Sequence, residues 1–302
     1  MRWNDLETAI EIYPPAEFNF KECLTFLERS EQEILHQVRD GYLDKLIKVR
    51  GALILLRIRS TSHIIQVEFP ANSTTFCIRE EVAQFVWQWF DLERDLRSFY
   101  QIAQQDKVLQ SIALKYDGLR IIGIPDLFEA LTWAIIGQQI NLTFAYTLKK
   151  RFVEHFGENL TFEGDNFWVF PSPEKIISIN VDELRELQFA TRKAEYIIGI
   201  AKAITDGKLT KEMLQQKQDY EQMKKFLIEF RGVGEWTADY VIMKCLQDPV
   251  AFPIADVGLH NALKYQLGLE RKPTIEEIKE LATNWDGWHA YATFYLWRSL
   301  YE

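Results

Sequence analysis

The chain has 302 residues, and 44 acidic side chains outnumber 35 basic ones, which gives a formal net charge of −9. Hydrophobic residues make up 47% and charged residues 26%, a composition that excludes a disordered or fibrous protein. At roughly 150 residues per domain, the length predicts two domains that each bury a core. The acidic balance argues against non-specific binding of nucleic acid, because neutralising phosphates requires Lys and Arg.

The three cysteines, Cys23, Cys77 and Cys245, lie far apart and form no CxxC pair. This spacing argues against a disulfide scaffold, a zinc site and an iron–sulfur cluster, so we expect no metal and no cofactor. The N-terminus lacks the apolar stretch of a signal peptide, and no apolar run is long enough to cross a bilayer. We therefore expect a cytoplasmic protein that contacts no membrane.

The first part of the chain mixes strand and helix patterns. Residues 8–13 alternate in polarity and end at two prolines, which predicts a strand. Asn19 is placed to cap a helix with apolar residues at three- and four-residue spacing. Residues 52–59 and 63–69 predict a hairpin with one better-buried face. Residues 1–117 are therefore predicted to form a small α+β domain with an antiparallel sheet.

From residue 118 onward the pattern is helical almost throughout. Asp126 and Asn141 are placed to cap two helices, and Gly157 is placed to end the second at its C′ position. The predicted fold class is α+β, with the antiparallel-sheet domain of residues 1–117 followed by an all-α domain of residues 118–302.

The most informative segment is a glycine-containing break between two helices. An apolar helical pattern ends at Phe230, breaks over Gly232, Val233 and Gly234, and resumes at Glu235. Two glycines one residue apart allow positive φ angles and leave backbone N–H groups unshielded. With the N-terminus of the next helix, these N–H groups can bind a phosphate without Lys or Arg. A bare GxG more often forms only a tight turn between helices.

The residues around this break resemble a known signature. The superfamily of helix-hairpin-helix DNA glycosylases carries a pattern that this chain resembles over residues 227–240, where it reads LxxFxGVGxWTAxY. Asp256 lies twenty residues after Trp236, where that superfamily has its catalytic carboxylate. Residues 134–138, 192–195 and 285–297 resemble helices of one branch, the bacterial 3-methyladenine DNA glycosylase II enzymes. The resemblance therefore covers nearly the whole chain.

This resemblance implies both a fold and a function. The fold is a TBP-like sheet domain followed by a helix-hairpin-helix glycosylase domain. The function is that of a monofunctional DNA glycosylase, which flips alkylated purines of the 3-methyladenine type out of duplex DNA and hydrolyses their N-glycosidic bond to begin base excision repair. The implied partner is alkylated double-stranded DNA, with a monovalent cation at the hairpin carbonyls, and the protein is expected to be a bacterial monomer.

The chain also departs from the family pattern at two places. Bifunctional members carry a lysine two residues after the second hairpin glycine, where this chain has Trp236. Without that amine no Schiff base with the sugar can form there, so we expect no strand cleavage. The glycosylase II enzymes that this chain resembles insert an apolar side chain into the duplex at the position after Gln138. This chain has Gln139 at that position. Either Gln139 or Ile140 is expected to fill the gap left by the flipped base.

The candidate site combines a carboxylate with aromatic side chains. Asp256 precedes a helical run, so it can serve as a plain N-cap, as the catalytic carboxylate, or as both. As a carboxylate it can stabilise positive charge on the deoxyribose, activate the attacking water, or both. Trp236 and Tyr240, spaced i and i+4, are expected to form the substrate-binding walls with Trp297. Such aromatic residues otherwise pack in cores, whereas a cationic base in an aromatic cleft gains up to about 2 kcal/mol.

Further residues complete the predicted site. The DNA-binding candidates lie in the hairpin and in the wedge segment, and they are Gly232, Val233, Gly234, Gln138, Gln139 and Ile140. Trp133 is an additional wall candidate, and His260, one turn after Asp256, is interpreted as structural because no second ligand stands at metal spacing. Lys193, beside Arg192, is either part of a solvated face or a phosphate contact.

Two alternative functions remain open from the sequence. A helix-hairpin-helix module can bind damaged or bent DNA without performing chemistry. A glycosylase of this type can also act on oxidised or deaminated purines.

Overall fold

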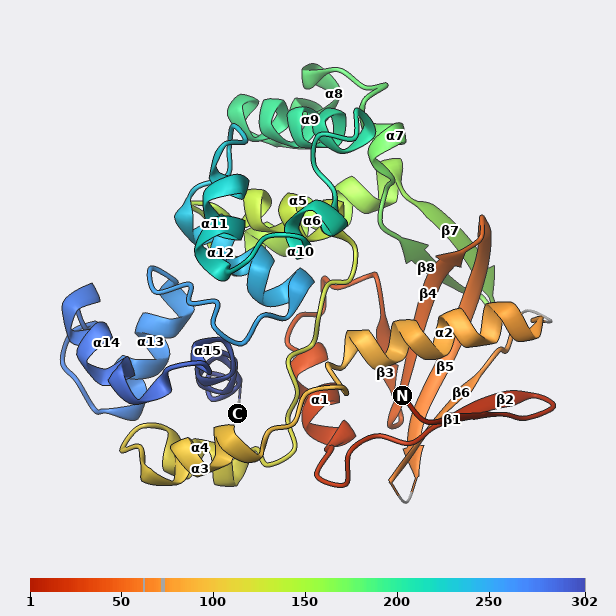
Figure 1. The fold of residues 1–302 in the computed structure, drawn as a ribbon. Helices are drawn as coiled ribbons and strands as arrows, with labels where there is room; N and C mark the ends of the chain where they lie inside the picture. The colour runs from red at the N-terminus through yellow and green to blue at the C-terminus, as the bar shows by residue number, and fades with distance from the viewer. Residues whose placement is uncertain (62, 72–73, 302) are drawn as a thin grey trace.

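The computed structural model describes residues 1–61, 63–71 and 74–301, which form a sheet-containing first region and a helical second region (Figure 1). In the described part, six antiparallel strands form one sheet in the order β1-β2-β6-β5-β4-β3. The strands are β1 (Trp3–Asp5), β2 (Ala9–Ile12), β3 (Gln37–Arg39), β4 (Tyr42–Val49), β5 (Ala52–Thr61) and β6 (Ile64–Glu68). The predicted antiparallel sheet is therefore confirmed, as is the β5–β6 hairpin.

The first region also contains helices that cover one face of the sheet and lead into the second region. They are α1 (Phe20–Leu27), α2 (Phe76–Trp89), α3 (Arg97–Gln105) and α4 (Leu109–Lys115). In Figure 1, α2 crosses the sheet, while α3 and α4 lie beside the last helix of the chain. The alternation in β5 explains this layering, because Ile54, Leu56 and Ile58 join the main hydrophobic core.

The second region is helical, as its sequence pattern predicts. Its helices are α5 (Leu127–Gly137), α6 (Leu142–Phe156), α7 (Pro173–Ile176), α8 (Val181–Glu186), α9 (Thr191–Thr205), α10 (Lys211–Gln215), α11 (Tyr220–Ile228), α12 (Glu235–Val241), α13 (Val257–Gln266), α14 (Ile275–Leu281) and α15 (His289–Arg298). A π-helical turn, η1 (Ile242–Leu246), extends α12, and a 3₁₀ turn, η2 (Ala282–Trp285), extends α14. Among the described residues, no helix is both long and apolar enough to cross a bilayer.

A short hairpin interrupts the helices and was not expected from the sequence. Strands β7 (Glu158–Phe162) and β8 (Asp165–Val169) pair antiparallel after α6. Phe167 on β8 packs with Leu46 of β4 and Leu55 of β5, which point away from the main core. The hairpin therefore belongs to the second region in sequence but covers the open face of the first region's sheet.

The predicted helix caps are largely confirmed. Asn19, Asp126 and Asn141 each accept a hydrogen bond from the backbone N–H three residues later, at 3.2, 2.7 and 2.8 Å. Gly157 ends α6 as predicted, but as its C-cap residue and not at C′, with an extended φ of −75° and ψ of 171°. Glycine fits there for a steric reason, since a Cβ would lie 2.6 Å from the Val153 carbonyl oxygen.

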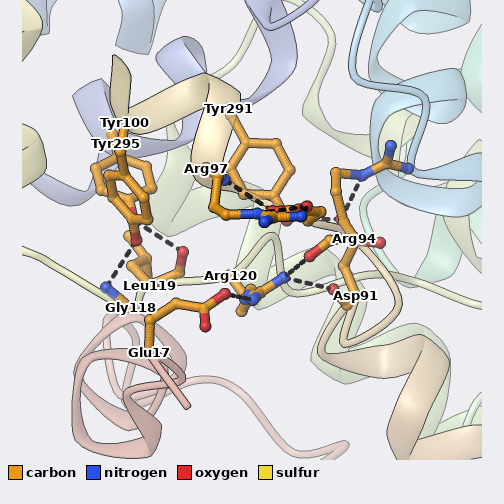
Figure 2. A network of polar contacts seen from close by, with 11 residues as sticks. Glu17, Asp91, Arg94, Arg97, Tyr100, Gly118, Leu119, Arg120, Tyr291 and Tyr295 are labelled. Carbon is orange, nitrogen blue, oxygen red and sulfur yellow. Dashed lines mark hydrogen bonds and ion pairs between the residues drawn. The ribbon is translucent and has the colours of Figure 1, made fainter. Parts of the chain in front are cut away.

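The two regions meet around a buried arginine in the segment between α4 and α5 (Figure 2). Arg120 is fully buried and donates to the backbone carbonyls of Asp91, at 3.2 Å, and Arg94, while its other amino group pairs with Glu17. These partners precede α1 or follow α2, so one guanidinium joins three separate segments of the chain. Such a charge is tolerated in the interior only because it is paired and hydrogen-bonded.

The same junction fixes the last helix. From α15, Tyr291 donates to the Asp91 carboxylate at 2.6 Å, and Tyr295 donates to the Leu119 carbonyl at 3.0 Å (Figure 2). A continuous hydrophobic core runs through both regions. The domain boundary after residue 117 stays a prediction.

Candidate active site

The glycine-containing break forms a hairpin between α11 and α12. Gly232 has a φ of +95°, and a Cβ there would lie within 2.6 Å of the Tyr196 ring on α9, so both conformation and space require glycine. Gly234 is exposed and occupies the N-cap of α12, where no side chain of the described residues caps the helix. The backbone N–H groups in the first turn of α12 are therefore left for another partner.

The C-terminal end of α5 holds this hairpin in place. The Gln138 side-chain amide donates to the Gly232 carbonyl and to the Thr237 hydroxyl, both at 2.9 Å. The structure thus gives Gln138 a role inside the protein, whereas the next residue projects outward. Gln139 is exposed with a φ of +55°, which is uncommon outside glycine, and Ile140 packs partly against the core.

Asp256 lies between two tryptophans from different helices. The indole N–H of Trp236, on α12, donates to Asp256 Oδ2 at 3.0 Å, and that of Trp297, on α15, donates to Oδ1 at 2.8 Å. Asp256 also caps α13, since Oδ1 accepts from the Leu259 backbone N–H at 2.8 Å. The N-cap interpretation is therefore confirmed, and the same carboxylate has two indole partners.

Tyr240 packs with these two tryptophans in an aromatic cluster beside Asp256. Its ring centroid lies 5.6 Å from that of Trp236 and 6.1 Å from that of Trp297. The Trp133 indole N–H donates to the Tyr240 hydroxyl at 2.9 Å, and both side chains are only 8% exposed. Burial raises the pKa of Tyr240, so the hydroxyl stays neutral. The structure brings the three predicted wall residues together and adds Trp133 behind them.

Gly258, beside Asp256 and Trp297, was not identified from the sequence. Gly258 lies in the first turn of α13, where a Cβ would come within 2.9 Å of Asp256 Oδ1 and 3.1 Å of Trp297 Nε1. Only a residue without a side chain allows Trp297 to approach the carboxylate this closely. A glycine two residues after an N-cap was the available signal, but nothing in the sequence pairs it with a tryptophan 39 residues later.

His260 is held by a backbone contact. Its ring nitrogen Nε2 lies 2.8 Å from the carbonyl oxygen of Ile254, in agreement with a structural role. Within the described ranges, no three His, Cys, Asp or Glu side chains gather closely enough to hold a metal ion.

Basic side chains around the hairpin are engaged within the protein. Lys193 donates to the Ile136 carbonyl at 2.7 Å, Arg231 pairs with Glu195 at 2.8 Å, and Lys224 pairs with Asp239 at 3.1 Å. The Lys193 amine therefore binds the C-terminal end of α5, and burial lowers its pKa.

Comparison with known families identifies this arrangement. The sequence model for the HhH-GPD superfamily base excision DNA repair proteins matches residues 132–286, about half of the chain. The chain belongs to the HhH-GPD superfamily. A second model, described as the N-terminal domain of 8-oxoguanine DNA glycosylase, matches residues 12–131 of this HhH-GPD protein. The family resemblance seen in the sequence is confirmed.

Individual relatives agree with this assignment. The DNA-3-methyladenine glycosylase of Bacillus subtilis is 42% identical over 304 residues, with complete coverage of both chains. DNA-3-methyladenine glycosylase 2 of Escherichia coli is 30% identical over 180 residues, 60% of each chain. The solved 3-methyladenine DNA-glycosylase of Archaeoglobus fulgidus matches with a TM-score of 0.81 at 26% identity, covering 95% of this chain and 97% of that one. The HhH-GPD protein is a DNA glycosylase of base excision repair.

We expect Gly258→Ala to separate activity from stability. An added methyl group pushes Trp297 or the Asp256 carboxylate aside, and misplacing a reacting group by about 1 Å costs up to about 100-fold in rate. Alanine also favours a helix over glycine by about 1 kcal/mol, so the folded protein should keep its stability. Base-release kinetics and thermal unfolding measure the two effects. Gly199→Ala, on α9 where a Cβ meets open space, is the matched control. Full activity in Gly258→Ala would contradict the expected steric effect.

Proposed function

We propose that the protein is a monofunctional glycosylase that hydrolyses the N-glycosidic bond of alkylated purines, of the 3-methyladenine type, in duplex DNA. The observation that carries this proposal is the Asp256 carboxylate held by two indole N–H groups beside the aromatic cluster of Trp236, Tyr240 and Trp297, which we take as the wall of the base-binding cleft. The names of the relatives from Bacillus subtilis and Archaeoglobus fulgidus support the same substrate class. Base chemistry of this kind requires the nucleotide to leave the stack and enter such a cleft.

Asp256 is the proposed catalytic residue. A purine methylated at N3 carries a positive charge and leaves as a neutral base, so no strong general acid is needed. As the C1′–N bond breaks, positive charge moves to the deoxyribose, where a carboxylate stabilises it. The same carboxylate orients a water, which adds its hydroxyl to C1′ and transfers its proton to Asp256. Trp236 and Trp297 fix both carboxylate oxygens toward the cleft.

Trp236, Tyr240 and Trp297 are the proposed substrate-binding residues. Their rings pack together next to Asp256, and an electron-rich aromatic wall attracts a cationic base through stacking and cation–π interaction. Because Trp236 occupies the position of the lysine in bifunctional members, no amine is available there to form a Schiff base.

The proposed DNA contacts lie on one surface beside this cleft. Gly232 and Gly234 offer backbone N–H groups to a phosphate, whereas the Val233 N–H donates to the Phe230 carbonyl at 3.0 Å, so Val233 contributes to the hairpin turn itself. A monovalent cation at the hairpin carbonyls follows from the family resemblance. Gln139, exposed in a left-handed conformation, is the proposed residue that enters the duplex, with Ile140 packed beneath it. Gln138 acts by holding the hairpin.

We expect Asp256→Asn to lower the release of 3-methyladenine from methylated duplex DNA by about 100-fold or more. Loss of a preorganised charge at the reacting centre has effects of that order. Asparagine is a good N-cap, so α13 should persist. The matched control is Asp219→Asn, because Asp219 caps α11 in the same way, accepting from the Gln222 N–H at 2.9 Å. Activity of Asp256→Asn close to that of the wild type would refute the mechanism.

The same assay, run with a panel of lesions, separates the alternative functions. We expect alkylated purines to be released faster than oxidised or deaminated ones. The family model matched by residues 12–131 takes its name from 8-oxoguanine DNA glycosylase, so that lesion belongs in the panel. Tight binding of abasic DNA without release of any base would instead establish a binding module.

Treatment with borohydride during turnover should trap no covalent protein–DNA adduct. Trapping requires a Schiff base between an amine and C1′, and Trp236 supplies none. Denaturing gel electrophoresis detects such an adduct, and a bifunctional glycosylase serves as the positive control. A covalent band from this protein would refute the absence of lyase activity.

Binding of undamaged duplex should depend only weakly on salt. Each neutralised phosphate adds about 0.9 to the slope of log K against log salt, and three basic groups near the hairpin, Lys193, Lys224 and Arg231, are engaged within the protein. We expect a slope that corresponds to about five phosphate contacts or fewer, measured by fluorescence anisotropy over a range of salt. A steeper slope would reveal a basic DNA-binding surface elsewhere.

A further inference from the structure

A small cavity lies between the two regions of the chain, beside the proposed base-binding residue Tyr240. Its volume is ≈ 50 Å³, and Trp133 and Tyr240 form part of its wall. Charged side chains from both regions line the rest, among them Arg29, Glu33, Lys45, Glu129, Lys149 and Lys244. The proposed mechanism uses none of these charged groups. Their position beside Trp133 and Tyr240 therefore needs an explanation.

Two of them form a buried ion pair between the regions. Lys149 Nζ, on α6, lies 2.6 Å from Glu33 Oε2, in the segment between α1 and β3, and the side chains are only 10% and 7% exposed. Glu33 Oε1 also accepts from the backbone N–H groups of Ile34 and Leu35 at 3.0 and 2.9 Å. Burial alone would raise the pKa of Glu33, but Lys149 and His36 together with the hydrogen bonds to Lys149 and the Leu35 backbone lower it, so Glu33 is charged at neutral pH.

The ion pair leads directly to the cleft. The Lys149 ammonium lies 5.2 Å from the centroid of the Trp133 ring, within the range of a cation–π contact. Trp133 in turn donates its indole N–H to the Tyr240 hydroxyl at 2.9 Å. The Lys149 ammonium, which Glu33 of the first region fixes, therefore contacts the Trp133 indole. That indole in turn binds the hydroxyl of Tyr240.

Stability alone does not account for this pair. Burying two charges costs desolvation, and apolar replacements of buried pairs are often neutral or stabilising. The regions are also joined by a second Lys–Glu pair, Lys48 on β4 with Glu158 on β7, at the same 2.6 Å. That pair is 43% and 52% exposed and lies on the strands away from the cleft. Joining the regions therefore does not require a buried charge behind Trp133.

We propose that Glu33 and Lys149 are positioning residues for base excision, which act through Trp133 to set the orientation of Tyr240 in the substrate cleft. The first region thereby contributes to catalysis without touching DNA or the reacting atoms. This inference rests on the proposed function, because it takes the cleft of Trp236, Tyr240 and Trp297 as the base-binding site.

The first test compares Lys149→Met with Lys48→Met, the matched control at the exposed pair. Single-turnover base release from methylated duplex and the dissociation constant for abasic duplex are measured for each. We expect Lys149→Met to slow base release about tenfold, equal to about 1.4 kcal/mol, with abasic-DNA affinity within twofold of the wild type. Lys149→Arg should restore most of the rate, and Lys48→Met should change neither quantity.

A double-mutant cycle tests the route through Tyr240. Tyr240→Phe removes the hydroxyl that Trp133 binds. If Lys149 acts through that contact, the double variant loses no more activity than Tyr240→Phe alone. Losses that add, or equal losses in Lys149→Met and Lys48→Met, would overturn the proposal. Glu33→Gln, which keeps an oxygen for the two backbone N–H groups, provides the same comparison should Lys149→Met fold poorly.

A spectroscopic measurement makes the test independent of activity. The indole N–H signals of the nine tryptophans are recorded by ¹⁵N NMR. In Lys149→Met we expect the signals of Trp133, Trp236 and Trp297 to move, and in Lys48→Met we expect them to stay. Unmoved signals would overturn the positioning role whatever the enzyme's substrate. Absence of base release by the wild type, with the signals moved, would refute the proposed function and leave the positioning of the cleft established.

Discussion

The site depends on a single carboxylate that three N–H donors hold. Asp256 Oδ1 accepts from the Leu259 backbone and the Trp297 indole, and Oδ2 accepts from the Trp236 indole. These donors come from α13, α15 and α12, so the carboxylate connects three helices as well as capping one of them. Its structural role and its proposed chemical role use the same geometry, because a carboxylate fixed in advance needs little reorganisation when charge develops beside it.

The acidity of the chain takes on a different meaning once the hairpin is seen in three dimensions. A net charge of −9 argues against broad electrostatic capture of DNA. It does not argue against local contact, because the first-turn N–H groups of α12 bear no side-chain cap and Gly234 leaves them open. Lys193, for which a phosphate contact is one of the two alternatives, donates to a carbonyl of the protein itself, and Arg231 pairs with a carboxylate.

Local patterns predicted what local physics determines. The caps at Asn19, Asp126 and Asn141 and the left-handed Gly232 depend on residues within one turn, and all are as expected. The grouping of Trp236, Tyr240 and Trp297 could be inferred only through the family resemblance. The hairpin of β7 and β8 escaped prediction because its burial comes from Phe167 packing on a distant sheet.

Contacts between distant residues account for the remaining misses. Gly258 is required by Trp297, and Lys149 is paired with Glu33, 116 residues away, so neither role has a signature in the local sequence. These contacts also explain why the sheet-containing region belongs to a glycosylase. Trp297, one of the proposed wall residues, lies on α15. Tyr291 of the same helix donates to the Asp91 carboxylate, and the Asp91 carbonyl accepts from Arg120. The central wall, Tyr240, is bound by Trp133, which lies beneath the Lys149 ammonium. Because both proposed wall residues are linked to the first region through these contacts, removal of that region would leave α12 and α15 without them.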